Sequence, residues 1–249
     1  MIQLFRYFIP EDKRKPSLVC IGNFDGVHLG HRQLLDRVSS LQQEQGEQLR
    51  TCLLSFYPHP AVVLKKAEKL PRLTTLREKS DLLKANGIDA LFLLRFTKGL
   101  SSLSASEFID QYLIEMLEVK ELVVGEDAAV GKAREGDVEF LTNYLGERGV
   151  GVHVISNFEL EGGRIASGRI RKLVEKGKAS LVSKLLGRPY QLNGKVVSGD
   201  GRGKTIGVPT ANLFSIVKLF PKHGVYACFA TVYGERYLAV STVGVRRSF

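Results

Sequence analysis

Two histidines spaced three residues apart are the most chemically suggestive feature of this 249-residue sequence. They lie in residues 22–31, GNFDGVHLGH, directly after an apolar run and at the start of an amphipathic stretch. A helix start presents unpaired N–H groups and the positive end of the helix dipole, which favour phosphate. His28 and His31 can project from one side of such a helix end and hydrogen-bond phosphate oxygens where charge develops.

Gly30 lies between the two histidines and leaves room for an anion to approach. Two alternatives stay open from the residues alone. Histidines at this spacing can bind a metal, although no third ligand stands nearby in the sequence. The segment can also be a turn that contains two incidental histidines.

A second cluster of suggestive residues is the glycine-rich segment 201–213, GRGKTIGVPTANL. Glycines let the backbone approach phosphate and form concave groups of N–H donors. Thr210 and Asn212 offer oxygen atoms, the ligands that a hard cation such as Mg²⁺ takes. The segment does not have the Walker spacing, and a β-barrel turn is the alternative.

The elements that must position these residues alternate between strands and helices over the first three-quarters of the chain. Apolar runs predict strands, and helical spacing or capping boxes predict helices. We expect strands at 18–21, 51–56, 89–95, 121–125 and 151–155, and helices at 32–45, 75–87, 104–117 and 138–145, with two short helices around Ile170 and Leu181. This order predicts an α/β fold with a parallel sheet covered on both faces, which binds ligands at strand carboxyl ends near the reversal of strand order.

The pattern changes near residue 187, where glycines become frequent and short strands are expected at 225–232 and 237–240. We therefore place a domain boundary there. The three cysteines are far apart and few, which is typical of a reducing cytoplasm. No apolar run approaches the roughly 20 residues of a membrane span, and the first residues lack the features of a signal peptide. We expect a cytoplasmic protein without a membrane partner.

The net charge of +10 fits either nucleic acid or a small polyanion such as a nucleotide. Residues 164–188 carry eight cations against the single anion Glu175, without aromatic residues between them. A stacking surface for single strands is therefore poorly supported. We predict a phosphate-handling surface and no nucleic-acid partner. The alternative, a nucleic-acid binder, requires a steep salt dependence of its affinity.

Residues 22–31 match the pattern Gly-x-Phe-Asp-Gly-x-His-x-Gly-His, which resembles the start of the HxGH nucleotidyltransferases. The chain as a whole resembles the bacterial bifunctional riboflavin kinase/FMN adenylyltransferase family, also called FAD synthetase. Further matching segments are 56–60 (FYPHP), 79–89, 104–108 and 185–190 (LLGRPY). The resemblance implies a Rossmann-like nucleotidyltransferase domain over residues 1–187, followed by a partial riboflavin-kinase-type β-barrel over residues 188–249.

The resemblance also implies a reaction for the first domain, in which the FMN phosphate attacks the α-phosphorus of ATP to give FAD and pyrophosphate. Without a covalent intermediate, positioning and charge neutralisation supply the catalysis. His28, His31 and Arg171 are the expected catalytic residues. His59 and Asp127 are expected on the flavin side, although His59 can equally cap a loop. The remaining residues implied to bind ATP or its phosphates are Gly22, Asn23, Phe24, Asp25, Gly26, Gly30 and Ser167.

Two segments depart from the family pattern. Ala128 and Val130 replace two phenylalanines, and a lost aromatic stacking face is worth about 1–3 kcal/mol. Ala166 and Gly168 replace two hydroxyl residues at a second expected helix start. These losses motivate an alternative, a degenerate relative that binds a nucleotide or a partner without turnover.

The glycine-rich segment resembles the riboflavin kinase signature G-R-G-x-x-x-G-x-P-T-A-N. The resemblance implies that Gly207, Pro209, Thr210 and Asn212 hold Mg-ATP while the 5′-hydroxyl of riboflavin attacks the γ-phosphate. Thr210 and Asn212 are the implied Mg²⁺ ligands. Residues 241–249 depart from the family pattern and stop before its carboxylate base, and a domain of about 60 residues is marginal. We therefore expect a truncated kinase module with absent or severely reduced activity.

Overall fold

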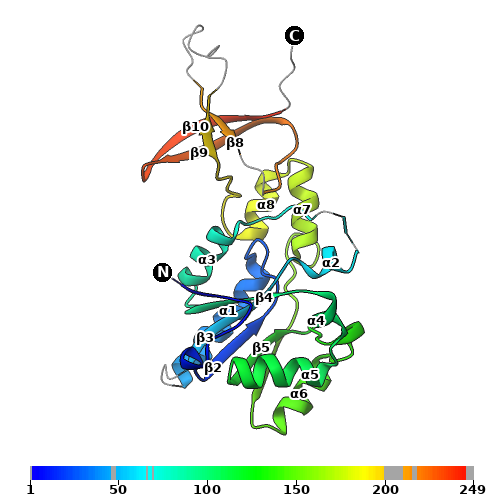
Figure 1. Ribbon diagram of the computed structural model, residues 1–249. Coiled ribbons are helices and arrows are strands. Elements are labelled where there is room, and N and C mark those ends of the chain that lie inside the picture. The colour runs from blue at the N-terminus through cyan, green and yellow to red at the C-terminus, as the bar shows by residue number, and fades with distance from the viewer. Residues whose placement is uncertain are drawn as a thin grey trace. The chain divides into compact units, whose positions relative to one another are not determined.

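The computed structural model describes residues 2–45, 49–65, 67–68, 70–198, 210–214 and 218–244. Contacts between residues divide the chain into two compact units (Figure 1). The first unit consists of Met1–Leu70 and Leu76–Ile165, and the second consists of Pro71–Thr75 and Ala166–Phe249. Each unit is described by itself below.

The first unit is built on a six-stranded sheet in which every neighbouring pair is parallel, as the sequence predicts. The strand order is β1-β4-β3-β2-β5-β6. The strands are β1 (Gln3–Arg6), β2 (Ser17–Ile21), β3 (Arg50–Tyr57), β4 (Ala90–Arg95), β5 (Val119–Gly125) and β6 (Gly151–Ile155). The edge strand β1 was not expected, because only one of its four side chains, Phe5, is buried and its apolar pattern is weak.

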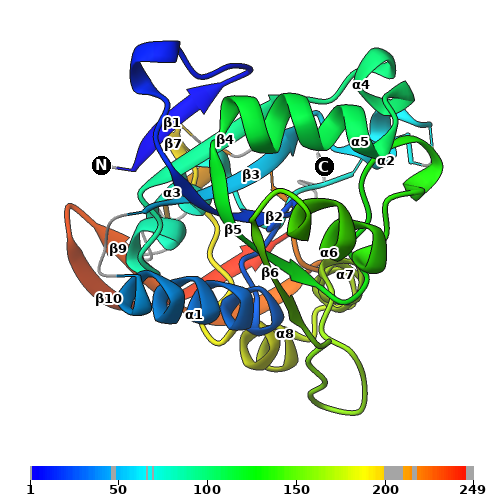
Figure 2. The ribbon, with the colours of Figure 1, turned by 90° about the horizontal axis from the view of Figure 1, so that it is seen from below.

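Helices cover both faces of this sheet (Figure 2). They are α1 (Leu29–Glu44), α2 (Pro60–Val63), α3 (Leu76–Ala85), α4 (Lys98–Ser102), α5 (Ala105–Phe108), the π-helix Ile109–Met116 and α6 (Val138–Gly146), with 3₁₀ turns at Glu11–Lys13 and Lys132–Arg134. Successive residues of β2 pack on opposite faces: Val19 belongs to the core beneath α5 and α6, and Cys20 to the core beneath α1 and α3. This two-sided burial explains why the parallel strands are continuous apolar runs.

Two predicted helix starts can be compared directly with the structure. Ser104 and Glu107 form the predicted capping box: the Ser104 Oγ accepts from the Glu107 N–H at 3.2 Å, and Glu107 Oε2 accepts from the Ser104 N–H at 2.7 Å. Helix α3 begins at Leu76, directly after Thr75, where the sequence places its start.

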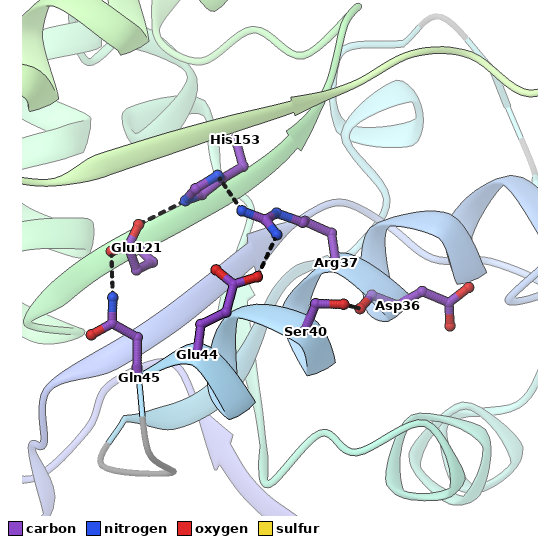
Figure 3. Close-up of polar contacts among 7 residues, drawn as sticks. All are labelled: Asp36, Arg37, Ser40, Glu44, Gln45, Glu121 and His153. Carbon is purple, nitrogen blue, oxygen red and sulfur yellow. Dashed lines mark hydrogen bonds and ion pairs between the residues drawn. The ribbon is translucent and has the colours of Figure 1, made fainter.

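The carboxyl-terminal half of α1 is fastened to the sheet by a chain of polar contacts (Figure 3). Arg37 donates to Glu44 at 2.9 Å and to the Nδ1 of His153 on β6 at 3.3 Å. Because a guanidinium only donates, His153 Nδ1 accepts, and its Nε2–H donates to Glu121 on β5 at 2.8 Å. Gln45 donates to the other Glu121 oxygen at 3.2 Å. The far end of α1 is thus fixed against β5 and β6.

The order of the strands reverses at β2, which lies between β3 and β5. The chain runs from β2 outward through β3 to β4 on one side, and continues through β5 to β6 on the other. The carboxyl ends of β2 and β5, at Ile21 and Gly125, therefore border the point where ligands bind in open α/β sheets. The two-histidine segment begins at this point.

The second unit contains helices α7 (Ser167–Glu175) and α8 (Ala179–Leu186), both of which the sequence predicts. Its described strands form two separate two-stranded antiparallel sheets: β7 (Lys195–Val197) with β8 (Asn212–Phe214), and β9 (Gly224–Val232) with β10 (Glu235–Val243). The latter pair confirms the two short strands expected there. Among all the described residues, no helix has the length and hydropathy required to cross a bilayer.

Candidate active site

The turn between β2 and α1 has an unusual backbone. Phe24, Gly26 and Val27 have positive φ values of 46°, 91° and 40°. A non-glycine residue in this region costs about 1–3 kcal/mol, so the surrounding structure must hold the turn. Gly22 precedes the turn, and a Cβ there would lie only 3.0 Å from the Phe24 ring, so a larger residue would press on that ring.

The turn creates a stack of three rings. The His28 and His31 imidazoles are stacked with centroids 3.6 Å apart, and the Phe24 ring lies on the other side of His31 at 4.3 Å. Phe24 and His28 are 1% and 5% exposed. The structure therefore brings both histidines together at the start of α1, as their spacing predicts.

His28 is also the N-cap of α1. Its Nδ1 accepts from the His31 backbone N–H at 3.2 Å. A neutral imidazole that accepts at Nδ1 carries its proton on Nε2. His28 Nε2 is thus the hydrogen-bond donor of this ring, which suits it to an anionic ligand.

Gly30 has a role that the sequence does not reveal. A Cβ at this position would lie 3.3 Å from His28 Nδ1 and 3.4 Å from its Cε1. The absent side chain therefore makes room for the His28 ring itself, in addition to any space it leaves for an anion.

The start of the turn is held from two other elements. The Asn23 carbonyl accepts from Lys79 Nζ on α3 at 2.6 Å and from Ser55 Oγ on β3 at 3.3 Å. Neither side chain was singled out as functional from the sequence, although Lys79 falls in a segment with a family resemblance. Asp25, an expected ATP-binding residue, is buried with 7% exposure.

Asp127 lies in the turn after β5, at the same edge of the sheet as the two-histidine turn. Its carboxylate pairs with Arg164 at 2.6 Å, and both side chains are about half exposed. Arg134 donates to the Asp127 carbonyl at 2.6 Å. Of the two residues that replace the family's phenylalanines, Val130 is buried in the core and Ala128 packs partly buried against it.

His59 caps α2, because its Nδ1 accepts from the Ala61 backbone N–H at 3.1 Å. The structure thus shows the capping role that the sequence leaves open for this residue. Its expected place on the flavin side remains a prediction.

Ser167 and Arg171 belong to the second unit, one turn apart on α7. Arg171 Nε donates to the Pro71 carbonyl of the same unit at 3.0 Å. Ala166 is the N-cap of α7 and gives it no side-chain cap. The hydroxyl that the family carries at this position would therefore stand at the helix start, as expected.

Thr210 and Asn212, the implied kinase residues, are exposed at and just before β8. Their hydroxyl and amide oxygens have the hard-donor chemistry that Mg²⁺ requires. Gly207 and Pro209 lie outside the described residues. No cluster of three His, Cys, Asp or Glu side chains suited to a metal occurs in the described part of the chain.

The parallel sheet, its switch point and the histidine-bearing helix start define the first unit as a Rossmann-like nucleotidyltransferase domain. A model of the FAD synthetase family matches residues 10–169, and a model of the riboflavin kinase family matches residues 186–249. The chain therefore belongs to the family of bifunctional riboflavin kinase/FMN adenylyltransferases, which are transferases.

Curated relatives of this description support the assignment. The chain is 37% identical to one from Listeria monocytogenes (94% of this chain, 74% of the relative), 35% to one from Bacillus subtilis (98% and 76%), and 38% to one from Escherichia coli K12 (92% and 73%). A crystal structure described as a macrolide-efflux protein from Streptococcus pneumoniae is 30% identical, with a TM-score of 0.88 over 100% of this chain and 81% of that one.

These matches bear on two expectations from the sequence, a truncated kinase module and a relative that binds without turnover. The riboflavin kinase model extends over the whole glycine-rich and carboxyl-terminal region. The comparisons give no support to a truncated kinase module, nor to a degenerate relative that binds without turnover.

Proposed function

We propose that the first module transfers the adenylyl group of ATP to the phosphate of FMN, giving FAD and pyrophosphate. The observation that carries this proposal is the His28–His31 ring stack at the start of α1, beside the switch point of a sheet in a chain of this family. The P–O bond between the α-phosphorus and the pyrophosphate breaks as the FMN oxygen bonds to that phosphorus.

In this proposal the chain's own residues mainly position charge. His28 and His31 donate to the ATP phosphates, and Arg171 adds a guanidinium fork that neutralises the leaving pyrophosphate. The residues of the β2–α1 turn and Ser167 contact the nucleotide. Asp127 and His59 belong to the flavin side of the pocket.

We further propose that the second module, from about residue 188, phosphorylates riboflavin with ATP. Thr210 and Asn212 hold Mg²⁺ through their oxygens, and the family resemblance assigns Gly207 and Pro209 to the same Mg-ATP site. Magnesium would neutralise charge on the transferred phosphoryl group. The match of the riboflavin kinase model begins at residue 186, which supports the boundary proposed near residue 187.

The first activity is tested by incubating the purified protein with FMN, ATP and Mg²⁺ and separating the flavins chromatographically. We expect FAD to form, and His28→Asn or His31→Asn to lower the turnover by about 10²-fold or more, as removal of a charge-stabilising donor does. His223→Asn, an exposed histidine of the second unit, is the matched control. ATP binding without any FAD would overturn the proposal.

The second activity needs a separate assay, riboflavin with ATP and Mg²⁺, monitored for FMN. We expect FMN to form and Asn212→Ala to abolish it. A wild-type protein that makes FAD from added FMN but no FMN from riboflavin would refute the kinase proposal alone.

A further inference from the structure

The carbonyl of Asn23 accepts hydrogen bonds from two side chains that lie far from it in the sequence. Lys79 Nζ donates to it at 2.6 Å, and Ser55 Oγ donates to it at 3.3 Å. Lys79 Nζ also lies 3.4 Å from the Ser55 Oγ. Ser55 is fully buried on β3, and Lys79 is half-buried on α3. One peptide of the β2–α1 turn is therefore tied to two different elements of the first unit.

These hydrogen bonds restrain the turn directly before its left-handed residues. Immediately after Asn23 the backbone enters the left-handed region at Phe24, returns to it at Gly26 and stays there at Val27. Such conformations persist only when the surroundings over-determine them. Phe24 also starts the ring stack, since its ring lies against His31, which in turn lies against His28. A movement of the Asn23 peptide would therefore displace both histidine rings.

The Lys79 donor is charged, which makes its hydrogen bond to the Asn23 carbonyl stronger than one from a neutral donor. Hydrogen bonds with an ionised partner are shorter and about twice as strong as neutral pairs, and the 2.6 Å separation fits that class. Ser55 alone, at 3.3 Å, is a longer and weaker partner for the same oxygen. The ammonium is therefore the principal restraint on this carbonyl.

We propose that Lys79 is a positioning residue for adenylyl transfer, which fixes the Asn23 carbonyl and thereby sets the Phe24–His31–His28 ring stack. The proposal rests on the proposed function only for its kinetic consequence. The structural consequence, a rearranged ring stack, can be measured without turnover.

The structural test is histidine NMR on wild type, Lys79→Met and Lys79→Arg. Methionine keeps most of the apolar stem and removes the ammonium, and arginine restores a positive donor. In wild type, the stacked rings place the His28 and His31 protons in each other's ring current. We expect Lys79→Met to shift these two sets of signals and leave the other three histidines unmoved, and Lys79→Arg to restore them partly.

The kinetic test is FAD synthesis at varied ATP and FMN. An error of about 1 Å in the position of a catalytic group can cost about 10²-fold, so we expect kcat to fall about 10- to 100-fold in Lys79→Met. The KM for ATP should change less, because the histidines act mainly as charge develops. Lys84→Met is the matched control on the same helix, since Lys84 is exposed; it should match wild type in turnover and NMR. Thermal unfolding of each variant verifies that it is folded.

Each failure has a separate meaning. A Lys79→Met protein with unmoved His28 and His31 signals overturns the positioning role, whatever its activity. Unmoved signals with a raised KM for ATP and an unchanged kcat would instead show that Lys79 contacts the nucleotide directly. If the signals move as expected but wild type itself makes no FAD, the proposed function fails while the structural role of Lys79 stands.

Discussion

Replacing Gly30 by alanine should lower the turnover of the first module while changing its folding stability little. The Gly30 backbone has no left-handed φ, so an L-residue can adopt it. The added Cβ would lie 3.3 Å from His28 Nδ1, 3.4 Å from its Cε1 and 3.6 Å from the Ile165 carbonyl oxygen. The new methyl group therefore presses chiefly on one side of the His28 imidazole, whose other neighbour is the His31 ring.

The free energies involved nearly cancel. Alanine in place of glycine stabilises the middle of a helix by about 0.5–1 kcal/mol, which is an upper limit at Gly30, the second residue of α1. Against this, a displaced His28 weakens the cap that its Nδ1 makes to the His31 N–H, and an N-cap is worth about 0.5–2 kcal/mol. We expect the free energy of unfolding to change by no more than about 1 kcal/mol. A ring shift of a few tenths of an ångström should lower kcat about three- to tenfold, since an error of 1 Å can cost about 10²-fold.

The assay is steady-state FAD synthesis together with urea unfolding of Gly30→Ala. Gly146→Ala is the control, because a Cβ at this last residue of α6 would meet no heavy atom within 4 Å. It should preserve kcat and leave stability unchanged or slightly raised. Wild-type kcat in Gly30→Ala would refute the idea that His28 must keep its position against residue 30. A loss of stability well above 1 kcal/mol would show that the contact is mainly structural.

Three further outcomes follow from the structure. In the folded protein, burial raises the pKa of Cys20 well above its usual range and that of Cys52 to about 12. Alkylation at pH 8, followed by mass spectrometry, should therefore modify Cys228 first. Rapid labelling of either buried thiol would contradict this. Ala166→Ser should supply the missing cap of α7 and raise the free energy of unfolding by about 0.5–2 kcal/mol in urea. Hydrogen bonds from Ser104 lower the pKa of Glu107, so the ionised carboxylate stabilises the fold above the unfolded pKa of about 4.3, and this stabilisation is lost as the pH falls through the folded pKa. Glu107→Gln should therefore be less stable than wild type at pH 7 and approach wild-type stability in acid. Parallel pH profiles of unfolding for the two proteins would contradict this.

The features that the sequence predicts correctly are those determined by neighbouring residues. The apolar run of β2, the turn after it and the helix that follows lie within one short stretch, so their order places His28 and His31 at a strand's carboxyl end. The capping box at Ser104 and Glu107 is equally local and is present as predicted. Such patterns need no knowledge of the tertiary contacts.

The features that the sequence does not reveal depend on distant residues. Lys79 reaches Asn23 across 56 positions, and no spacing rule connects a lysine on one helix with a carbonyl after another strand. The role of Gly30 depends on the position of the His28 ring, which stacks on His31 and accepts from the His31 backbone N–H, while Phe24 stacks on His31 in turn. The edge strand β1 is identified only by its pairing with β4.

The segment after β5, where Ala128 and Val130 depart from the family pattern, has a different consequence in the structure from the one expected from the sequence. Cβ atoms at Gly131 and Gly136 would each come within 2.5 Å of Ala105, and Val130 pairs with Gly136 through two backbone hydrogen bonds. The loop is thus pressed against the start of α5, with the Val130 side chain in the core. A change from phenylalanine to valine at this position alters the volume of a packed interior, where the balance of cavity and overpacking decides the cost. The expected loss of a flavin-stacking face therefore rests on Ala128, the partly buried member of the pair.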